Sequence, residues 1–223
     1  MAKTRMHVGT AIVFLALCTA GIVAADTKTK IDFLSNGIGV APTDFEFWQT
    51  GRGAPGQWAV IRDPTAALGV AIEQFSLDQT DDRFPLAIYK PISLKNLEIT
   101  ARVKVVRGRM RSAGIAVRLV SPENYYVVRL SAMEERVDLY RVVAGKSERI
   151  AGTDADVFLD RWHRLGIRAE GDRLDVSIDG TFLFTAFDRT FLQDGRVALW
   201  TEEDNITRFD EIEIEPLPHS TGD

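Results

Sequence analysis

Two arginines stand out because each interrupts an otherwise apolar stretch. Arg118 and Arg129 lie in "SAGIAVRLVSPENYYVVRL" (residues 112–130), which has the composition of two strands joined by a turn. A guanidinium group is a planar fork of N–H donors that suits paired hydroxyl or carboxylate oxygens. The direction in which these two forks point, into a core or away from it, therefore decides what chemistry they can do.

A four-residue turn at residues 121–124 sets the register of the two strands and so predicts which face each arginine occupies. In this register Val120 faces Tyr125, and the aliphatic side chains gather on one face. That core face holds Ile115, Val117, Leu119, Tyr126, Val128 and Leu130. The opposite face holds Gly114, Ala116, Arg118, Tyr125, Val127 and Arg129.

A second short turn at residues 134–135 extends the pattern and places Asp138 and Tyr140 beside Arg129. Flat rings that stack on the CH faces of sugars, next to donors for their hydroxyl groups, are typical of saccharide sites. The alternative is a solvated sheet face in which these residues serve cross-strand packing. The candidate ligand-binding residues of this face are Arg118, Tyr125, Arg129, Asp138 and Tyr140.

A tryptophan and an acid follow in "WTEEDN" (residues 200–205). Trp200 and Glu202 share a face by alternation, so Trp200 is a further candidate for stacking on a sugar. Glu202 is the one candidate catalytic acid. The alternative is a core tryptophan that ends a strand before an acidic turn.

The first 25 residues have the features of a secretory signal peptide. Lys3 and Arg5 precede an apolar stretch, and Val23 and Ala25 occupy the positions that signal peptidase prefers before a cut. The stretch is also close to the roughly 17 residues needed to span a bilayer, so an uncleaved anchor is the alternative. Cleavage predicts a periplasmic or secreted protein with no membrane insertion afterwards.

The 198 residues after such a cut (223 minus 25) contain no cysteine, because Cys18 lies in the signal. A secreted chain without disulfides relies on its hydrophobic core, and this length can bury a sizeable one. Removal of Lys3 and Arg5 takes the formal net charge from −5 to −7. This charge argues against nucleic acid as a partner.

Segments of alternating apolar and polar residues recur along most of the chain, with turn signals between them. "LEITARVKV" (97–105) places its apolar residues on one face, and "RLDVSIDGTFLFTAF" (173–187) contains an Asp-Gly pair typical of a hairpin. The sequence therefore predicts an all-β fold, a two-sheet antiparallel jelly-roll sandwich. The predicted divisions are a signal peptide (1–25), an N-terminal extension or first strand (26–43), the sandwich (44–216) and a disordered tail (217–223).

Three stretches resemble the concanavalin A-like lectin/glucanase superfamily: residues 112–130, "WHRLGIRAEGDRLDVSIDG" (162–180) and "GRVALWTEEDNITRFDEIEIE" (195–215). They look like the laminin G-like jelly rolls of bacterial secreted proteins, including domains of the keto-disaccharide hydrolase type. The resemblance implies two curved sheets, with any ligand on the concave one. It does not imply one activity, because this fold hosts lectins, hydrolases and adhesion modules.

The resemblance also implies two kinds of acidic site. Retaining glucanases of the superfamily carry Glu-x-Asp-x-Glu on one strand, and the nearest string here, Glu211, Glu213 and Glu215, lacks the central Asp. In calcium-binding relatives an Asp of the last strand helps to hold the ion, so Asp210 is the candidate metal ligand and Ca²⁺ the candidate cofactor. The alternatives are a solvated acidic face and a carboxylate that accepts backbone N–H bonds.

These observations favour an exported jelly roll that binds a saccharide, a glycoconjugate or another ligand and has no catalytic centre. The alternative is a glycoside hydrolase or lyase that uses Glu202, and a second alternative is a structural module of the envelope. His163, expected to point outward, has no partner spacing for zinc and no nucleophile motif for a triad. Two carboxylates facing each other across a groove would indicate catalysis, whereas rings and arginines alone would indicate binding.

Overall fold

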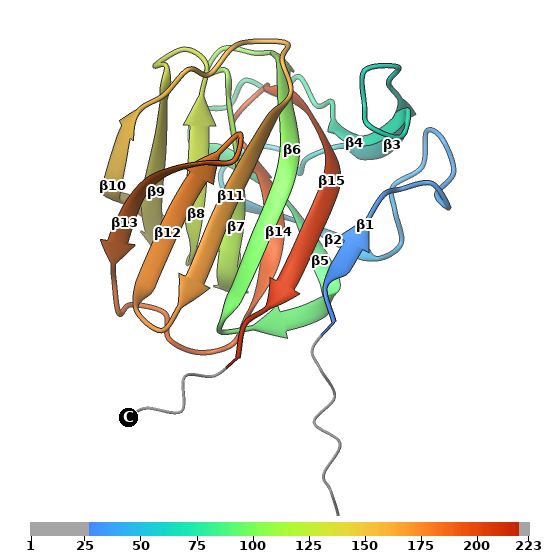
Figure 1. The fold of residues 1–223 in the computed structure, drawn as a ribbon. Helices are drawn as coiled ribbons and strands as arrows, with labels where there is room; N and C mark the ends of the chain where they lie inside the picture. The colour runs from blue at the N-terminus through green and yellow to red at the C-terminus, as the bar shows by residue number, and fades with distance from the viewer. Residues whose placement is uncertain (1–26, 219–223) are drawn as a thin grey trace, which may run out of the picture.

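The computed structural model describes residues 27–218 as two antiparallel sheets packed face to face (Figure 1). The predicted all-β jelly-roll sandwich is confirmed. The predicted signal peptide and Cys18 lie outside the described residues. Within 27–218 there is no helix with the length and apolar character needed to cross a membrane.

Each sheet combines strands that are far apart in the sequence. The eight-stranded sheet contains β1 (Thr29–Ile31), β3 (Trp58–Arg62), β4 (Val70–Gln74), β6 (Leu97–Arg107), β11 (His163–Glu170), β12 (Arg173–Ile178), β13 (Thr181–Phe187) and β15 (Ile206–Pro216). The seven-stranded sheet contains β2 (Phe45–Gly51), β5 (Arg83–Leu94), β7 (Ser112–Ser121), β8 (Asn124–Ser131), β9 (Arg136–Val143), β10 (Lys146–Asp154) and β14 (Gly195–Thr201). Its spatial order is β10-β9-β8-β7-β14-β5-β2, so β10 and β2 form its edges.

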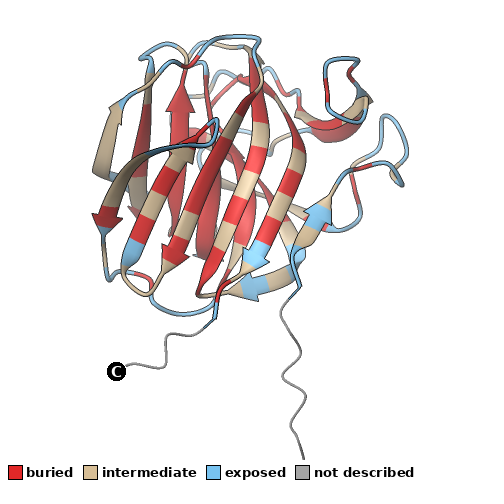
Figure 2. Cartoon of the chain, in the orientation of Figure 1, coloured by how far each residue is buried: buried red, intermediate tan, exposed pale blue. Residues whose placement is uncertain are grey.

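The core lies between the sheets and follows the alternation of the strands. Buried and less buried positions alternate along β6 and β15, which gives the striped strands of Figure 2. The predicted apolar face of β6 is fully buried: Leu97, Ile99, Ala101, Val103 and Val105. Burial of one face of each sheet supplies the main stabilisation of a chain that has no described disulfide.

The two ends of the described chain are joined to the eight-stranded sheet. β1, in the segment predicted as an extension or first strand, pairs with β15. Leu217, at the start of the predicted tail, is buried, and its backbone N–H donates to the carbonyl of Asn96 (3.1 Å).

The β7–β8 hairpin has the predicted turn but not the predicted register. Ser121 pairs with Asn124 as predicted. Further from the turn Ile115 faces Val128, whereas the predicted register pairs it with Leu130. Because the shift is two residues and side chains alternate with a period of two, Ile115 and Val128 are still buried between the sheets as predicted.

The shift has its cause in a bulge between Val117 and Ser121, where Arg118 has a positive φ of 49°. The bulge also changes which face the following residue occupies. Val117 packs in the core between the sheets, but Leu119 packs on the outer face of the seven-stranded sheet. The predicted inward position of Leu119 is therefore wrong.

The β8–β9 hairpin is also shifted by two residues relative to the prediction. Leu130 faces Val137 instead of Leu139, because the turn is longer than two residues. Arg129 and Asp138 face each other directly.

Arg141 shows how the core-facing side of β9 accommodates an arginine. Arg141 pairs regularly with Tyr126, and the strand continues past it to Val143. Its Nη1 donates to Asp188 Oδ2 (2.8 Å), and Asp188 Oδ1 accepts the hydroxyl of Tyr126 (2.6 Å). The guanidinium therefore ends in an ion pair at the rim of the core.

A buried ion-pair network crosses the outer face of the eight-stranded sheet. Asp63, almost fully buried, lies 2.6 Å from Lys104 Nζ and 3.0 Å from Arg208 Nη1. Burial alone raises the pKa of the Asp63 carboxyl, but the hydrogen bonds from Lys104, Thr65 and Arg208 outweigh it and leave the pKa well below its usual range.

This network predicts a loss of stability in acid. A carboxyl whose folded pKa is depressed stabilises the fold above its unfolded pKa, near 4, and loses that contribution as the pH falls further. We expect Asp63→Asn to cost about 2 kcal/mol of unfolding free energy at pH 6, and the gap to the wild type to shrink from pH 4 to pH 2. Urea denaturation of both proteins at several pH values measures this gap; a gap that stays constant with pH would contradict the prediction.

Candidate functional site

The outer face of the seven-stranded sheet, which points away from the other sheet, carries a second apolar cluster. Its buried members, here called the outer cluster, are Leu86, Ile88, Ala116, Leu119, Tyr125, Val127, Val142, Ala198 and Trp200. Partly buried Trp48, Phe84 and Tyr140 pack against it. A sheet face this apolar is unusual unless something covers it or binds to it.

The sheet itself covers part of this cluster. The hydroxyl oxygens of Thr50 and Tyr125 lie 2.8 Å apart, and the Thr50 hydroxyl also donates to the carbonyl of Pro122. Thr50 lies on β2 and Tyr125 on β8, with β5, β14 and β7 between them in the sheet. The seven-stranded sheet therefore curls toward its outer face, which is the concave one.

Tyr125 belongs to the closed part of this face. It is fully buried, and burial raises the pKa of its hydroxyl to about 12. It forms part of the contact between β2 and β8 and does not line the open hollow described next.

A hollow of about 230 Å³ opens on the outer face beside the closed part. This aromatic hollow is lined by Phe84, Met110, Val127, Arg129, Glu134, Tyr140, Ser147, Trp200 and Glu202. The rings of Phe84 and Trp200 are stacked, with centroids 5.3 Å apart and an interplanar angle of 17°. Stacked rings and a phenol beside polar groups suit a ligand that has one apolar face and several hydroxyl groups.

One buried guanidinium organises the polar side of the aromatic hollow. Arg129 Nε donates to Glu202 Oε2 (3.2 Å), and Arg129 Nη1 donates to Glu134 Oε2 (2.9 Å). The hydroxyl of Ser112 also donates to Glu202. Burial lowers the pKa of Arg129, but Glu134 and Glu202 outweigh this effect and leave the pKa raised. Arg129 therefore stays charged and fixes both carboxylates at the hollow.

Arg118 does not reach the aromatic hollow. Its Nε donates to the carbonyl of Lys95 (2.8 Å) and its Nη1 to the carbonyl of Phe191 (2.9 Å), and its side chain is fully buried. The prediction that it shares an open face with Arg129 is wrong, because the bulge at Arg118 redirects its side chain. The guanidinium instead holds together the loop between β5 and β6 and the loop between β13 and β14.

Asp138 lies on the outer face beside Arg129, as predicted, but it lines a neighbouring hollow of about 280 Å³. This arginine hollow is lined by Glu134, Arg136, Asp138, Tyr140 and Arg149. The Asp138 carboxylate is buried and accepts Arg136 Nε (2.8 Å) and Arg149 Nε (2.6 Å). The two hollows are contiguous, since both are lined by Glu134 and Tyr140.

Comparison with known proteins gives fold relatives only. No family model matches the chain, and no curated protein matches it. Among solved structures, the carbohydrate-binding module CBM66 from Bacillus subtilis superposes with a TM-score of 0.61 at 18% identity, over 76% of this chain and 94% of that one. The cellulose-induced protein Cip1 superposes with a TM-score of 0.61 at 9% identity, over 87% and 100%. The chain therefore has the same jelly-roll fold as these structures.

A third structure of this kind contains a saccharide. Domain 4 of AbnA, a GH43 extracellular arabinanase from Geobacillus stearothermophilus, in complex with arabinotriose, superposes with a TM-score of 0.56 at 13% identity, over 84% of this chain and 90% of that domain. At identities this low, the superpositions establish a shared jelly-roll fold but not a shared ligand. The ligand must therefore be argued from the site.

The jelly roll brings together part of the predicted site. Arg129, Tyr140, Trp200 and the acid Glu202 all line the aromatic hollow, although they come from β8, β9, β14 and the segment after β14. The further lining residues that the sequence reasoning missed are Phe84, Met110, Val127, Glu134 and Ser147. Alternation could have placed Phe84 on this face, because it is separated by two and four residues from the buried Leu86 and Ile88 of β5. Alternation could not have placed Glu134, because it lies in a turn.

Asp210, the candidate calcium ligand, lies at a bulge of β15, where the register with β6 shifts between Asp210 and Glu213. Its Oδ2 accepts the backbone N–H of Ala67 (2.7 Å) and Arg102 Nη1 (3.1 Å). Burial raises the pKa of this carboxyl. No group of three or more His, Cys, Asp or Glu side chains in the described chain is arranged to hold a metal ion. The geometry is that of a carboxylate bound to a backbone N–H and an arginine.

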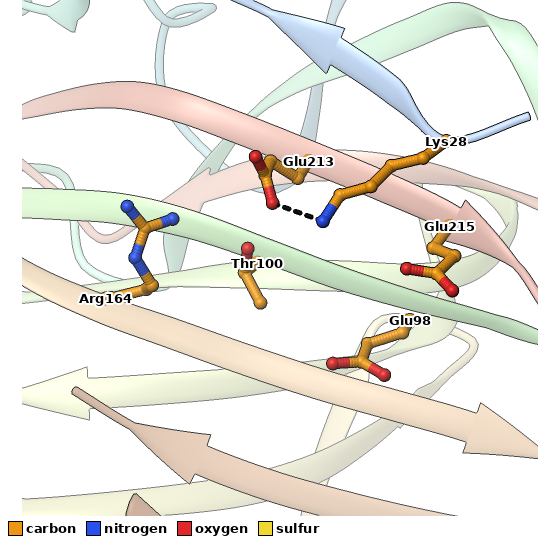
Figure 3. A pocket seen from close by; sticks show the side chains of 6 residues that line it. All are labelled: Lys28, Glu98, Thr100, Arg164, Glu213 and Glu215. Atoms are coloured by element: carbon orange, nitrogen blue, oxygen red, sulfur yellow. Dashed lines mark ion pairs between the residues drawn. The ribbon is translucent and has the colours of Figure 1, made fainter. Parts of the chain in front are cut away.

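Two members of the acidic string of β15, Glu213 and Glu215, line a hollow on the eight-stranded sheet (Figure 3). A hollow of about 330 Å³ there is lined by Lys28, Glu98, Thr100, Arg164, Glu213 and Glu215. Glu213 pairs with Lys28 (2.5 Å) and Lys30 (3.0 Å), and these lysines lower the pKa of its carboxyl. A glycosidase acid needs a raised pKa, so the pairing is unlike that of a catalytic acid.

His163 is buried rather than outward-pointing, so the predicted orientation is wrong. Its Nε2 accepts the backbone N–H of Phe158 (3.0 Å), and its Nδ1 lies 2.8 Å from Asp179 Oδ2. Both ring nitrogens are therefore engaged in holding the segment before β11.

Proposed function

We propose that this jelly roll is an exported saccharide-binding protein that takes a sugar in the aromatic hollow. The observation that carries the proposal is the aromatic hollow itself, in which the Phe84–Trp200 stack and Tyr140 lie beside fixed polar groups on the concave sheet. Rings accept the CH face of a sugar, and a carboxylate with a free oxygen accepts its hydroxyl groups. The carbohydrate-binding module and the arabinotriose-bound domain among the fold relatives support the same choice.

The arrangement of the acids favours binding over hydrolysis. Glu134 and Glu202 both bond to the guanidinium of Arg129, instead of facing each other across an open gap. The two acids of a glycosidase flank the scissile bond, whereas these two are held by the same guanidinium group. In this proposal the carboxylates orient the ligand and transfer no proton.

Tyr140 offers the cleanest test, because it lines both hollows and is only half-buried. On a glycan array followed by calorimetric titration, Tyr140→Ala should weaken binding of the best glycan at least tenfold, since one stacked ring contributes about 1 kcal/mol or more beyond its buried area. The thermal midpoint should move by only a few degrees.

A matched control is Phe187→Ala, which removes an exposed ring from β13 of the other sheet. This variant should bind as the wild type does. Equal affinity of Tyr140→Ala and wild type would overturn the placement of the site, and appearance of cleaved glycan during incubation would favour the enzyme instead.

We also propose that cleavage after Ala25 releases the protein to the periplasm or the medium. The support is the basic start, the apolar stretch and the small residues before Asp26. N-terminal sequencing of the protein recovered from periplasm and medium should begin at Asp26. A membrane-bound protein that begins at Met1 would show that the segment is an anchor.

A further inference from the structure

The arginine hollow contains two guanidinium groups that lie on either side of a single buried carboxylate. Arg136 and Arg149 flank one buried carboxylate, Asp138, and each bonds to it through Nε. The other acid of this hollow, Glu134, is paired with Arg129. Asp138 is therefore the carboxylate that both guanidinium groups bind through Nε, and Arg136 also makes an ion pair with the exposed Asp154.

The terminal nitrogens of these arginines form the forked end that recognises anions. Among the described residues, neither Nη1 nor Nη2 of Arg149 has a hydrogen-bond partner, and its side chain is 46% exposed. The nearest further acid to Arg136 is Asp154, at 3.7 Å and almost fully exposed. The terminal nitrogens of Arg149 can therefore donate to a ligand oxygen without displacing a buried contact.

The arginine hollow is held in this form by the backbone of β10. A Cβ at Gly152 would lie 1.9 Å from Asp138 Oδ1 and 2.8 Å from Arg149 Nη2. Only glycine therefore lets Arg149 lie against Asp138, and Asp138 in turn directs both guanidinium groups. Since β10 is an edge strand, the arginine hollow opens at the side of the sheet.

The position of this charge matters because the arginine hollow adjoins the aromatic hollow through Glu134 and Tyr140. We infer that the ligand is an acidic saccharide, whose ring lies in the aromatic hollow and whose anionic group, a carboxylate or a sulfate ester, binds between Arg136 and Arg149. This inference rests on the proposed function and names the ligand class for the same site.

The test compares acidic glycans with their neutral parents. Oligogalacturonates and their methyl esters form one pair, and sulfated galactose oligosaccharides and their desulfated forms make the other. The wild-type protein should bind an acidic member about tenfold more tightly than its parent, because hydrogen bonds to charged groups are the stronger ones. Preference for the uronate would identify a carboxylate, and preference for the other acidic glycan a sulfate ester. Raising the salt concentration should reduce the difference.

Arg149→Gln should remove this preference and leave the affinity for the neutral parent unchanged. The matched control is Arg168→Gln, which changes an arginine on β11 of the other sheet that is ion-paired and 40% exposed. Arg149→Lys, which keeps a charge without the fork, should retain part of the preference. Unchanged thermal midpoints show that the variants are folded.

The outcomes separate this inference from the proposed function. If neutral and acidic glycans bind equally to the wild type, or if Arg149→Gln weakens both equally, the acidic ligand is excluded while the saccharide site stands. If no glycan of either kind binds, the proposed function fails and this inference fails with it.

Discussion

Replacing Arg83 with methionine should lower the unfolding free energy by about 3–5 kcal/mol. The side chain is fully buried, and its Nε, Nη1 and Nη2 donate to Ala54 O (2.6 Å), Glu203 O (2.5 Å) and Ser76 Oγ (3.0 Å). Methionine fills a similar volume but leaves these acceptors without donors, and the bonds to Glu203 O and Ser76 Oγ are buried. Urea denaturation followed by fluorescence measures the difference.

Arg52→Met is the control for this prediction. Arg52 lies on the surface with its side chain 69% exposed and makes an ion pair with the exposed Asp82. Its replacement should change the unfolding free energy by less than about 0.5 kcal/mol. If both variants lose the same amount, or if the Arg83 variant loses under 1 kcal/mol, the buried hydrogen bonds do not stabilise the fold as described.

The Arg83 variant should also bind saccharides poorly. Arg83 precedes Phe84, and its bond to Glu203 O fixes the residue that follows Glu202. Loss of these contacts should loosen both Phe84 and Glu202, which line the aromatic hollow. Saturation binding measured in the native baseline at low temperature should therefore show weaker affinity even where the variant is folded.

The second large effect is expected at Arg129, where stability and binding depend on the same group. Arg129→Met should cost about 3 kcal/mol, because it leaves Glu202 as a largely buried carboxylate without its cation. Saccharide binding should fall below detection, since Glu134 and Glu202 lose the group that orients them. Denaturation and calorimetry on the same preparation measure both effects.

The double variant Arg129→Met with Glu202→Gln distinguishes the two roles of Arg129. Removing the unpaired charge should recover most of the lost stability, while binding should stay lost. A single variant that loses binding with no change in unfolding free energy would mean that Arg129 contacts the ligand and is not needed by the sheet.

The sequence was most informative where a period of two decides the outcome. Alternation predicted the buried face of β6 and the outward position of Arg129 and Tyr140, because a side chain on a strand has only two faces to choose from. Errors arose where an extra residue enters a strand. The bulge at Arg118 is not marked by glycine, and it moved both Arg118 and Leu119 away from their predicted places.

Other parts of the site depend on strand order, which local patterns do not contain. β14 lies between β7 and β5, so Trp200 comes to stack on Phe84, more than 100 residues earlier in the chain. The arginine hollow depends on the pairing of β10 with β9, where a register shift between Arg149 and Ala151 accompanies the placement of Arg149 beside Asp138. These contacts are long-range, and no single stretch of sequence predicts them.

The contact between Thr50 and Tyr125 has a consequence for how the molecule meets other molecules. A large exposed apolar surface on a sheet normally leads to self-association or requires a partner that covers it. Here two strands of the same sheet, β2 and β8, meet over part of that surface, and the members of the outer cluster are buried. The accessible features of this face are the two hollows, which are lined by aromatic rings and charged groups. Binding there therefore depends on specific contacts and not on nonspecific hydrophobic attraction.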